Sequence, residues 1–110
     1  MEFSREKHGE LTLVTVTGRM DAVTAPAFEE QCLSLMQSGE KSLVADLGGL
    51  EYISSAGLRS ILSTAKKLKA AQGSLGFCNL QGIVLEVFTV SGFASMFPIH
   101  DSLDDALAKG

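Results

Sequence analysis

Residues 42–50, SLVADLGGL, constrain the fold of this 110-residue chain more than any other segment. Their apolar side chains are almost continuous, and helical patterns lie on both sides of them. Parallel strands that are covered on both faces have this composition, whereas a strand with one face in water alternates apolar and polar residues. The segment therefore predicts a buried strand in the centre of a largely parallel sheet.

The other strand-like segments are placed on either side of this one in the chain. The N-terminal piece up to His8 predicts a strand that turns tightly at HGE into a second strand, residues 11–18, which alternates with period two. Residues 74–80 predict a further core strand. Residues 96–100, MFPIH, predict a final edge strand, because proline lacks the amide donor that a central strand needs.

Four helical segments complete the pattern. The first is predicted to have Thr24 as its cap and Pro26 in its first turn. The second covers residues 55–72, the third covers residues 82–92, and the last begins after Ser102 as its cap. The second helix is predicted to bury one stripe of side chains and to expose Arg59. That buried stripe is Leu58, Ile61, Leu62, Ala65 and Leu68.

The resulting order, β-β-α-β-α-β-α-β-α, predicts an α/β fold in which residues 1–110 form one domain. Such alternation gives a central mixed, mostly parallel sheet of four or five strands with helices packed against it. Functional groups in these sheets gather outside the carboxyl ends of the strands. Three loops are therefore expected to meet there, formed by residues 18–23, 46–57 and 79–82.

Charge and hydropathy exclude several classes of partner. The net charge is −4, so the chain lacks the basic surface of nucleic-acid-binding proteins, and no nucleic-acid partner is expected. No apolar stretch approaches the ~20 residues of a membrane-spanning helix, and the N-terminus lacks the apolar core of a secretion signal. We expect no direct membrane insertion and a cytoplasmic location. Cys32 and Cys78 show no CxxC spacing and predict two buried free thiols.

Enzyme and cofactor motifs do not fit the sequence. The esterase pattern GxSxG and the phosphate-binding patterns GxxxxGK[ST] and GxGxxG do not occur. A nucleophilic serine needs a base, and the two histidines, His8 and His100, fall on outer segments. The Asp, Glu, His and Cys residues show no metal-ligand spacing. We therefore expect no catalytic residue, no metal and no cofactor.

Two adjacent serines, Ser54 and Ser55, stand where the central strand gives way to the second helix. One of them is expected to cap the helix by accepting a hydrogen bond from a free backbone amide. The other is a candidate for modification, because the free amides and partial positive charge of a helix N-terminus accommodate a phosphate. Phosphorylation would add roughly two negative charges without unfolding the domain.

The segments LVADLGGLEYISSAGLRSIL, residues 43–62, and TGRMDAVTAPAFEE, residues 17–30, resemble STAS domains, in particular the bacterial anti-sigma factor antagonists. The resemblance covers essentially the whole chain and implies a single-domain STAS-like fold. It also implies partner switching. In that family the unmodified antagonist binds an anti-sigma factor, which is also a serine kinase, and thereby frees the sigma factor. The kinase phosphorylates the antagonist, and the phosphorylated form cannot bind. A serine phosphatase restores the unmodified form.

The residue that matches the family's phosphorylated serine is Ser55. Asp21 corresponds to a loop aspartate near that serine, and Asp46 to the aspartate at the end of the central strand. Two positions depart from the pattern: Ser54 replaces a frequent aspartate and is the second choice for phosphorylation, and Ala56 replaces a frequent hydroxyl residue. The residues expected to bind the partner are Asp21, Asp46, Ser54, Ser55, Ala56, Gly57 and Arg59.

Some alternatives stay open at this point. Arg59 either touches the partner or is an ordinary surface residue. A second function for such a chain is that of a STAS scaffold subunit in a sensory assembly or a lipid-transporter complex, whose serines are only structural. The sequence fits a monomer or a weak dimer.

Overall fold

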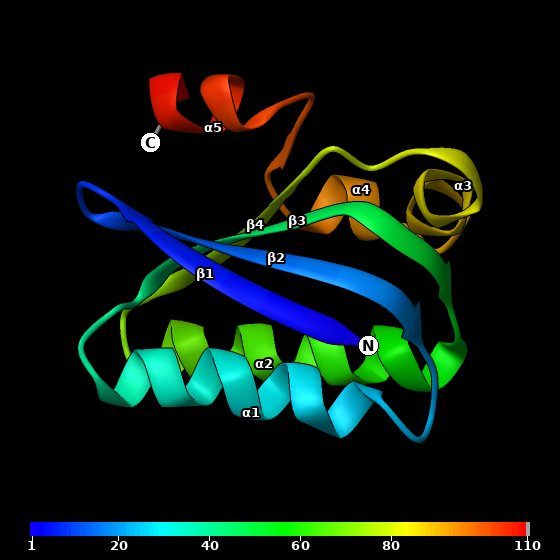
Figure 1. Ribbon diagram of the computed structural model, residues 1–110, viewed down its shortest axis with the longest axis horizontal. Helices are drawn as coiled ribbons and strands as arrows, with labels where there is room; N and C mark the ends of the chain where they lie inside the picture. Colours follow the sequence, from blue (N-terminus) through cyan, green and yellow to red (C-terminus); the bar gives the residue numbers. More distant parts are fainter. Residues whose placement is uncertain (110) are drawn as a thin grey trace.

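A computed structural model of the chain describes residues 1–109, with the side chains of residues 1–108. It contains one five-stranded sheet in the order β1-β2-β3-β4-β5, in which β1 is antiparallel to β2 and the other neighbours are parallel (Figure 1). The expected mixed, mostly parallel sheet with a central third strand is confirmed. The strands are β1 Glu2–His8, β2 Leu11–Met20, β3 Ser42–Ile53, β4 Ser74–Cys78 and β5 Ile99–His100.

The helices cover both faces of the sheet. Side chains alternate along the aligned strands, so Val14, Ala45 and Phe77 point to one face and Leu13 and Val44 to the other. The first face is covered by α1 and α2, which lie side by side beneath it, and the second by α5 (Figure 1). The helices are α1 Ala25–Gln37, α2 Ser55–Ala70, α3 Gly82–Val90, α4 Phe93–Met96 and α5 Leu103–Lys109.

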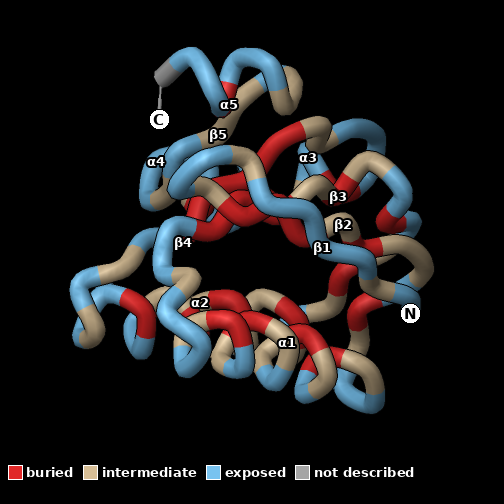
Figure 2. Tube along the Cα trace, turned by 60° about the vertical axis from the view of Figure 1, so that its left-hand side comes forward, coloured by how far each residue is buried: buried red, intermediate tan, exposed pale blue. Residues whose placement is uncertain are grey.

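The main core lies between the sheet and α1 and α2, where buried segments of the two layers face each other (Figure 2). Its far edge, beside β4, is closed by aromatic side chains from α3, α4 and the segment after α4. The Phe77 ring meets Phe88 edge to face at 5.1 Å between centroids and Phe97 at 5.5 Å. Each such pair stabilises the fold by about 0.5–1.5 kcal/mol beyond the effect of burying its apolar surface. The site at the start of α2 is therefore carried by a well-packed scaffold.

The central strand is longer than the sequence predicts. Residues 48–53, expected to lie in a loop, continue β3 and pair with the end of β2 as far as Met20↔Ile53. Gly49 lies opposite Thr17, where an added Cβ would come within 2.6 Å of the threonine methyl group. Glycine here allows close strand pairing next to a register shift, rather than a turn.

The C-terminal part also departs from expectation. Helix α4 was not predicted, and the final strand is reduced to Ile99–His100 at the sheet edge. Pro98 lies before that strand and still joins the ladder through its carbonyl oxygen, which accepts a hydrogen bond of 2.9 Å from the amide of Phe77. The cap of the last helix is confirmed, because the amide of Asp105 donates to Ser102 Oγ at 3.1 Å.

The core also contains a few polar or reactive side chains. Cys32 and Cys78 are both buried and free, as predicted, and burial raises the pKa of their thiols to about 12 and about 11. Thr64 is also fully buried on the sheet-facing side of α2, and its hydroxyl donates to the carbonyl of Ser60.

Within residues 1–109, no helix is long and apolar enough to cross a membrane.

Candidate functional site

The first turn of α2 separates the roles of the two serines. Ser54 has an extended backbone (φ −94°, ψ 174°), and its Oγ accepts a hydrogen bond of 3.2 Å from the amide of Gly57. Ser54 is therefore the cap of α2. Ser55 is the first helical residue, is exposed, and makes no side-chain hydrogen bond to any other described residue. One hydroxyl is thus committed to the fold and the other is free.

The start of α2 is held tightly against the ends of the two longest parallel strands. The amide of Ser54 donates to the carbonyl of Met20 at 2.9 Å, which fixes the helix entry to the end of β2. Gly57 is buried in the same place, and an added Cβ would lie 2.8 Å from Ile53 Cγ1 and 3.1 Å from the Met20 carbonyl oxygen. The glycine after Ala56 is therefore required by close packing, and it sets the position of the serines.

The loop between β2 and α1 is organised around Asp21. Its Oδ1 accepts hydrogen bonds from the amides of Val23 at 3.0 Å and Thr24 at 3.1 Å. The amide of Thr24, then that of Val23, holds the pKa of this carboxyl below its usual value, so Asp21 stays ionised. Because β2 ends beside Ser54, this loop lies next to the start of α2 (Figure 1).

Thr24 does not cap α1 as predicted. It occupies the cap position, but its backbone is helical (φ −94°, ψ −24°), which turns the hydroxyl away from the free amides of α1. The hydroxyl instead donates to the Arg19 carbonyl at 2.7 Å and accepts from the Asp21 amide at 2.9 Å. Thr24 thus stabilises the Asp21 loop.

Arg19 and Tyr52 form a surface pair that the sequence did not reveal. They are paired neighbours on β2 and β3, and Arg19 Cζ lies 4.4 Å from the centroid of the Tyr52 ring. This cation–π contact comes one residue before the buried pair Met20 and Ile53. Recognising that β3 extends to Ile53 would have placed these two side chains together.

Asp46 lies apart from the serines. It sits in the first half of β3, where Oδ1 accepts from the amide of Gly48 at 2.9 Å and Oδ2 from Asn79 Nδ2 at 3.0 Å. Eight residues of extended chain, about 25 Å, separate it from Ser54. The expectation that Asp46 ends the central strand is wrong, because β3 runs on to Ile53.

For the same reason the three loops do not meet at one point. The loop before α1 reaches Ser54, whereas residues 79–82 reach the first half of β3, with Gln81 Nε2 donating to the Gly48 carbonyl at 2.8 Å. Strand β4 ends at Cys78, opposite Asp46, while β2 and β3 continue. The unequal strand lengths therefore divide the carboxyl ends into two separate clusters.

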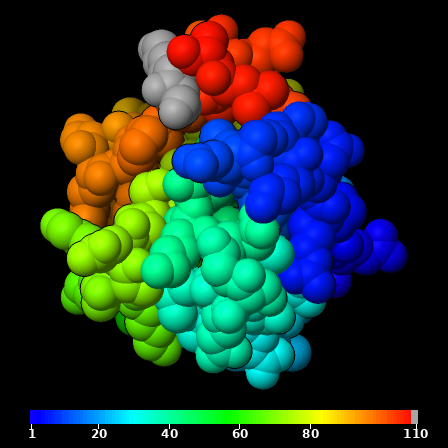
Figure 3. Space-filling view, turned by 90° about the vertical axis from the view of Figure 1, so that its left-hand side faces the viewer, coloured from blue at the N-terminus to red at the C-terminus, as the bar shows by residue number. Residues whose placement is uncertain are grey.

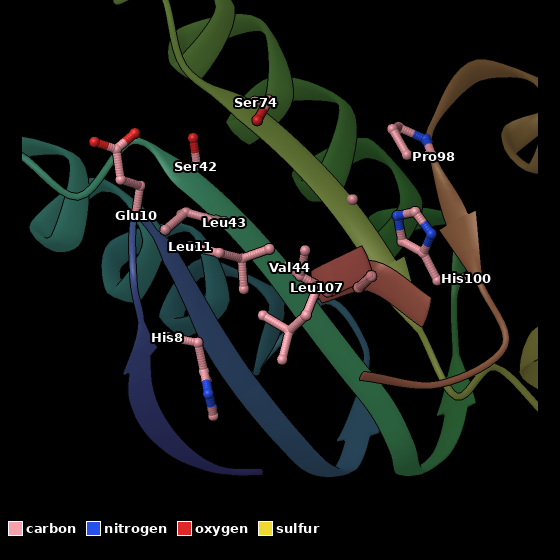
Figure 4. A pocket seen from close by; sticks show the side chains of 12 residues that line it. His8, Glu10, Leu11, Ser42, Leu43, Val44, Ser74, Pro98, His100 and Leu107 are labelled. Atoms are coloured by element: carbon pink, nitrogen blue, oxygen red, sulfur yellow. The ribbon is translucent and has the colours of Figure 1, made fainter. Parts of the chain in front are cut away.

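A pocket lies at the end of the sheet opposite the start of α2. Figure 3 shows the molecule from this end, with α5 (red) above the β1–β2 hairpin (blue). The pocket has a volume of about 570 Å³ and an apolar floor of Leu11, Val44 and Leu107, with His8 and His100 on opposite sides (Figure 4). His8 pairs with the first residue of β2, and His100 with Cys78. Neither histidine is placed to activate Ser55, which follows the opposite end of β3.

The start of α2 offers free backbone amides and no metal-binding cluster of side chains. Among the residues described, no set of three His, Cys, Asp or Glu side chains is arranged to hold a metal ion. The first turn of α2 contains no acidic residue, so its free amides are not already paired with a carboxylate. This arrangement suits a group that gains negative charge at Ser55.

The strand order, the long β3 and the serine-capped helix that follows it define a single-domain α/β protein with its exposed serine at a helix start. The STAS domain model matches residues 2–106, and the chain belongs to the STAS domain family. The expected family and STAS-like fold are thereby confirmed.

Similar proteins have related names. A putative anti-sigma factor antagonist, BtrV of Bordetella bronchiseptica, is 39% identical over 108 residues, which cover 98% of this chain and 93% of BtrV. An anti-sigma factor antagonist from Mycobacterium paratuberculosis has a crystal structure with a TM-score of 0.86 and 30% identity, covering 98% of this chain and 92% of that one. Phosphorylated SpoIIAA of Bacillus has a TM-score of 0.74, 17% identity and 98% coverage of both chains, and shares the fold.

Proposed function

We propose that this protein is an anti-sigma factor antagonist that acts by reversible binding and is switched by phosphorylation of Ser55. In the unmodified state it binds an anti-sigma factor serine kinase in the cytoplasm and releases the sigma factor. The observation that carries the proposal is the division of the two serines, since Ser54 caps α2 while the Ser55 hydroxyl is exposed and free. The names of relatives with 39% and 30% identity support the same function.

Ser55 is a better phosphoryl acceptor than Ser54. The kinase transfers the γ-phosphoryl group of ATP to Ser55 Oγ, ADP leaves, and the hydroxyl proton passes to a base of the kinase. A serine phosphatase reverses the change by adding water and releasing inorganic phosphate. Ser54 is less accessible to a kinase, because it is half-buried and its Oγ is already engaged with the Gly57 amide.

The proposed contact surface is the end of the molecule around the start of α2. It comprises Asp21, Ser54, Ser55, Ala56, Gly57 and Arg59, together with the neighbouring Val23, whose side chain is largely exposed. Gly57 is buried and contributes by positioning the others. Asp46 is bonded to Gly48 and Asn79 in the other cluster, so we assign it a structural role and leave it outside this surface.

The protein acts in this scheme as a binding partner and not as a catalyst. Ser55 lacks the neighbouring base that a serine nucleophile needs, because His8 pairs with the first residue of β2 and His100 pairs with Cys78, level with Asp46 and far from Ser55 along β3. Its charge state decides the outcome. A phosphate buried in the interface without a compensating group on the partner would cost several kcal/mol, which would weaken binding at least about a hundredfold.

Phosphoryl transfer to defined variants tests the proposal. The parent chain, Ser55→Ala and Ser54→Ala are incubated with radiolabelled ATP and each kinase-like anti-sigma factor encoded in the same genome, and the modified residue is mapped by mass spectrometry. We expect label on Ser55 in the parent and in Ser54→Ala, and none in Ser55→Ala. Equal labelling of Ser55→Ala would reject Ser55 as the site, and no labelling by any kinase would favour the scaffold function.

A further inference from the structure

We propose that Arg59 is the counterion, within the same helix, of the phosphate on Ser55. Phosphorylation then does two things at once, because it adds negative charge to the contact surface and withdraws the Arg59 guanidinium from the partner. This inference rests on the proposed function, since it requires Ser55 to be the modified residue.

The spacing in α2 brings the two side chains together. Residues four apart in a helix are neighbours on one side of it, about 6 Å apart along the axis. Ser55 and Arg59 are both exposed. The other sides of α2 are occupied: Ile61 is buried in the core against the sheet, and Ser60 Oγ donates to the Ala25 carbonyl of α1 at 3.0 Å. The stripe of Ser55 and Arg59 therefore faces solvent.

The guanidinium of Arg59 is available for a new partner. Within the described part of the chain, no carboxylate lies within 4 Å of it, and the ion pairs that do form involve Lys7, His8 and Lys67. The planar fork of a guanidinium matches two oxygens of a phosphate, so the pair can be bidentate. A phosphate at the first helical residue and an arginine one turn later thus complement each other in charge and geometry.

The neighbouring cations are less well placed. Arg19 is held over the ring of Tyr52 at 4.4 Å, on the strands and not on the helix. Lys66 is exposed on the same stripe of α2 but eleven residues beyond Ser55, about 16 Å along the axis, which exceeds the screening length of about 8 Å in physiological salt. Lys66 therefore offers a matched control, since it carries the same charge on the same stripe at a non-bonding distance.

The test is the ionisation of the phosphate itself, followed by phosphorus NMR. Phosphoserine is built into position 55 during protein synthesis by codon suppression, so no kinase is needed. A nearby cation favours the dianion and lowers the second pKa of the phosphate, which is about 6 when unperturbed. We expect this pKa to be lower in the parent than in Arg59→Gln by roughly 0.5–1, with Lys66→Gln close to the parent. The difference should largely disappear in about 1 M NaCl.

Each outcome decides the matter. Equal pKa values in the parent and Arg59→Gln would overturn the proposal, and so would an equally large change in Lys66→Gln, because that would indicate a general field and not a pair. Thermal melts of the unmodified variants show that folding is intact, as expected for exposed residues. The proposed function fails separately, if the phosphorylated parent binds the kinase as tightly as the unmodified protein whatever its pKa.

Discussion

At the start of α2, two adjacent hydroxyl groups have opposite surroundings. Ser54 accepts from the Gly57 amide and is half-buried, whereas Ser55 is exposed and has no partner among the described side chains. The backbone causes the difference, because the extended conformation of Ser54 turns its short side chain back onto a free amide of the first turn, whereas Ser55 already has a helical backbone and its hydroxyl points outward. The sequence predicted one cap and one free serine, but only the backbone of Ser54 shows which is which.

Removing the cap should therefore cost stability, while removing the other hydroxyl should not. We expect Ser54→Ala to lower the free energy of unfolding by about 1 kcal/mol, within a usual range of about 0.5–2. Ser55→Ala, its matched control, should stay within about 0.5 kcal/mol of the parent. Urea denaturation followed by circular dichroism measures both. A larger loss in Ser55→Ala than in Ser54→Ala would show that the roles are reversed.

At the scale of elements, the length of β3 decides which residues come together. The apolar run of residues 43–47 predicted the central strand correctly, but the residues after it were assigned to a loop, whereas β3 continues to Ile53. The continuation depends on Thr17 lying against Gly49, a contact between residues more than thirty positions apart. Local sequence patterns do not contain such a contact, so the placement of Asp46 away from Ser54 was not predictable.

Asp46 belongs to the attachment of β4 to β3, and its substitution should show this. Asp46→Ala leaves the Gly48 amide and the Asn79 side-chain amide without their partner, which should lower the free energy of unfolding by about 1–3 kcal/mol. Phosphorylation of Ser55, measured at a temperature where the variant is folded, should remain at the parent rate. A normal melting temperature combined with lost phosphorylation would return Asp46 to the contact surface.

The contact between α1 and α2 should make stability depend on pH. Glu29 accepts from Lys67 Nζ and Ser63 Oγ, both at 2.8 Å. The Lys67 ammonium group, and then the Ser63 hydroxyl, hold the pKa of Glu29 below its usual value of 4.5. The unfolded chain therefore binds this proton more readily, so the contribution to stability is present above about pH 4.5 and is lost as the pH falls through the folded-state pKa.

Glu29→Gln should consequently flatten the acid limb of the stability curve. We expect the variant to lose less stability than the parent as the pH falls below about 4.5, and the two curves to run parallel at neutral pH. Urea titrations at a series of pH values measure this. Glu30→Gln is the control, because Glu30 is an exposed neighbour on α1. Identical acid limbs for the parent and Glu29→Gln would contradict the assignment.

At the scale of the whole molecule, the two ends of the sheet have different character. The start of α2 and the Asp21 loop form the proposed contact surface at one end, and the pocket with His8 and His100 lies near the other (Figure 1, Figure 4). Between them stands a core closed by α1, α2 and the phenylalanine cluster. Fold class, the central position of the third strand and the serine pair followed from sequence, because apolar periodicity and helix-start residues are local signals.

The proposed switch needs this core to remain unchanged when Ser55 is modified. The added phosphate lies at an exposed helix start, where free amides and the helix dipole favour an anion, so the fold has no reason to open. In the proposed mechanism, the partner surface carries no group that compensates the added charge. Binding and folding should therefore respond differently to the same modification.

Calorimetric titration of the cognate kinase with the parent, Ser55→Ala and the Ser55-phosphorylated protein measures how phosphorylation changes binding. We expect the parent and Ser55→Ala to bind with similar affinity, and the phosphorylated protein to bind at least about a hundredfold more weakly. Thermal melts should show all three proteins equally folded at the titration temperature. Equal affinity of the phosphorylated and unmodified proteins would show that phosphorylation of Ser55 does not control binding.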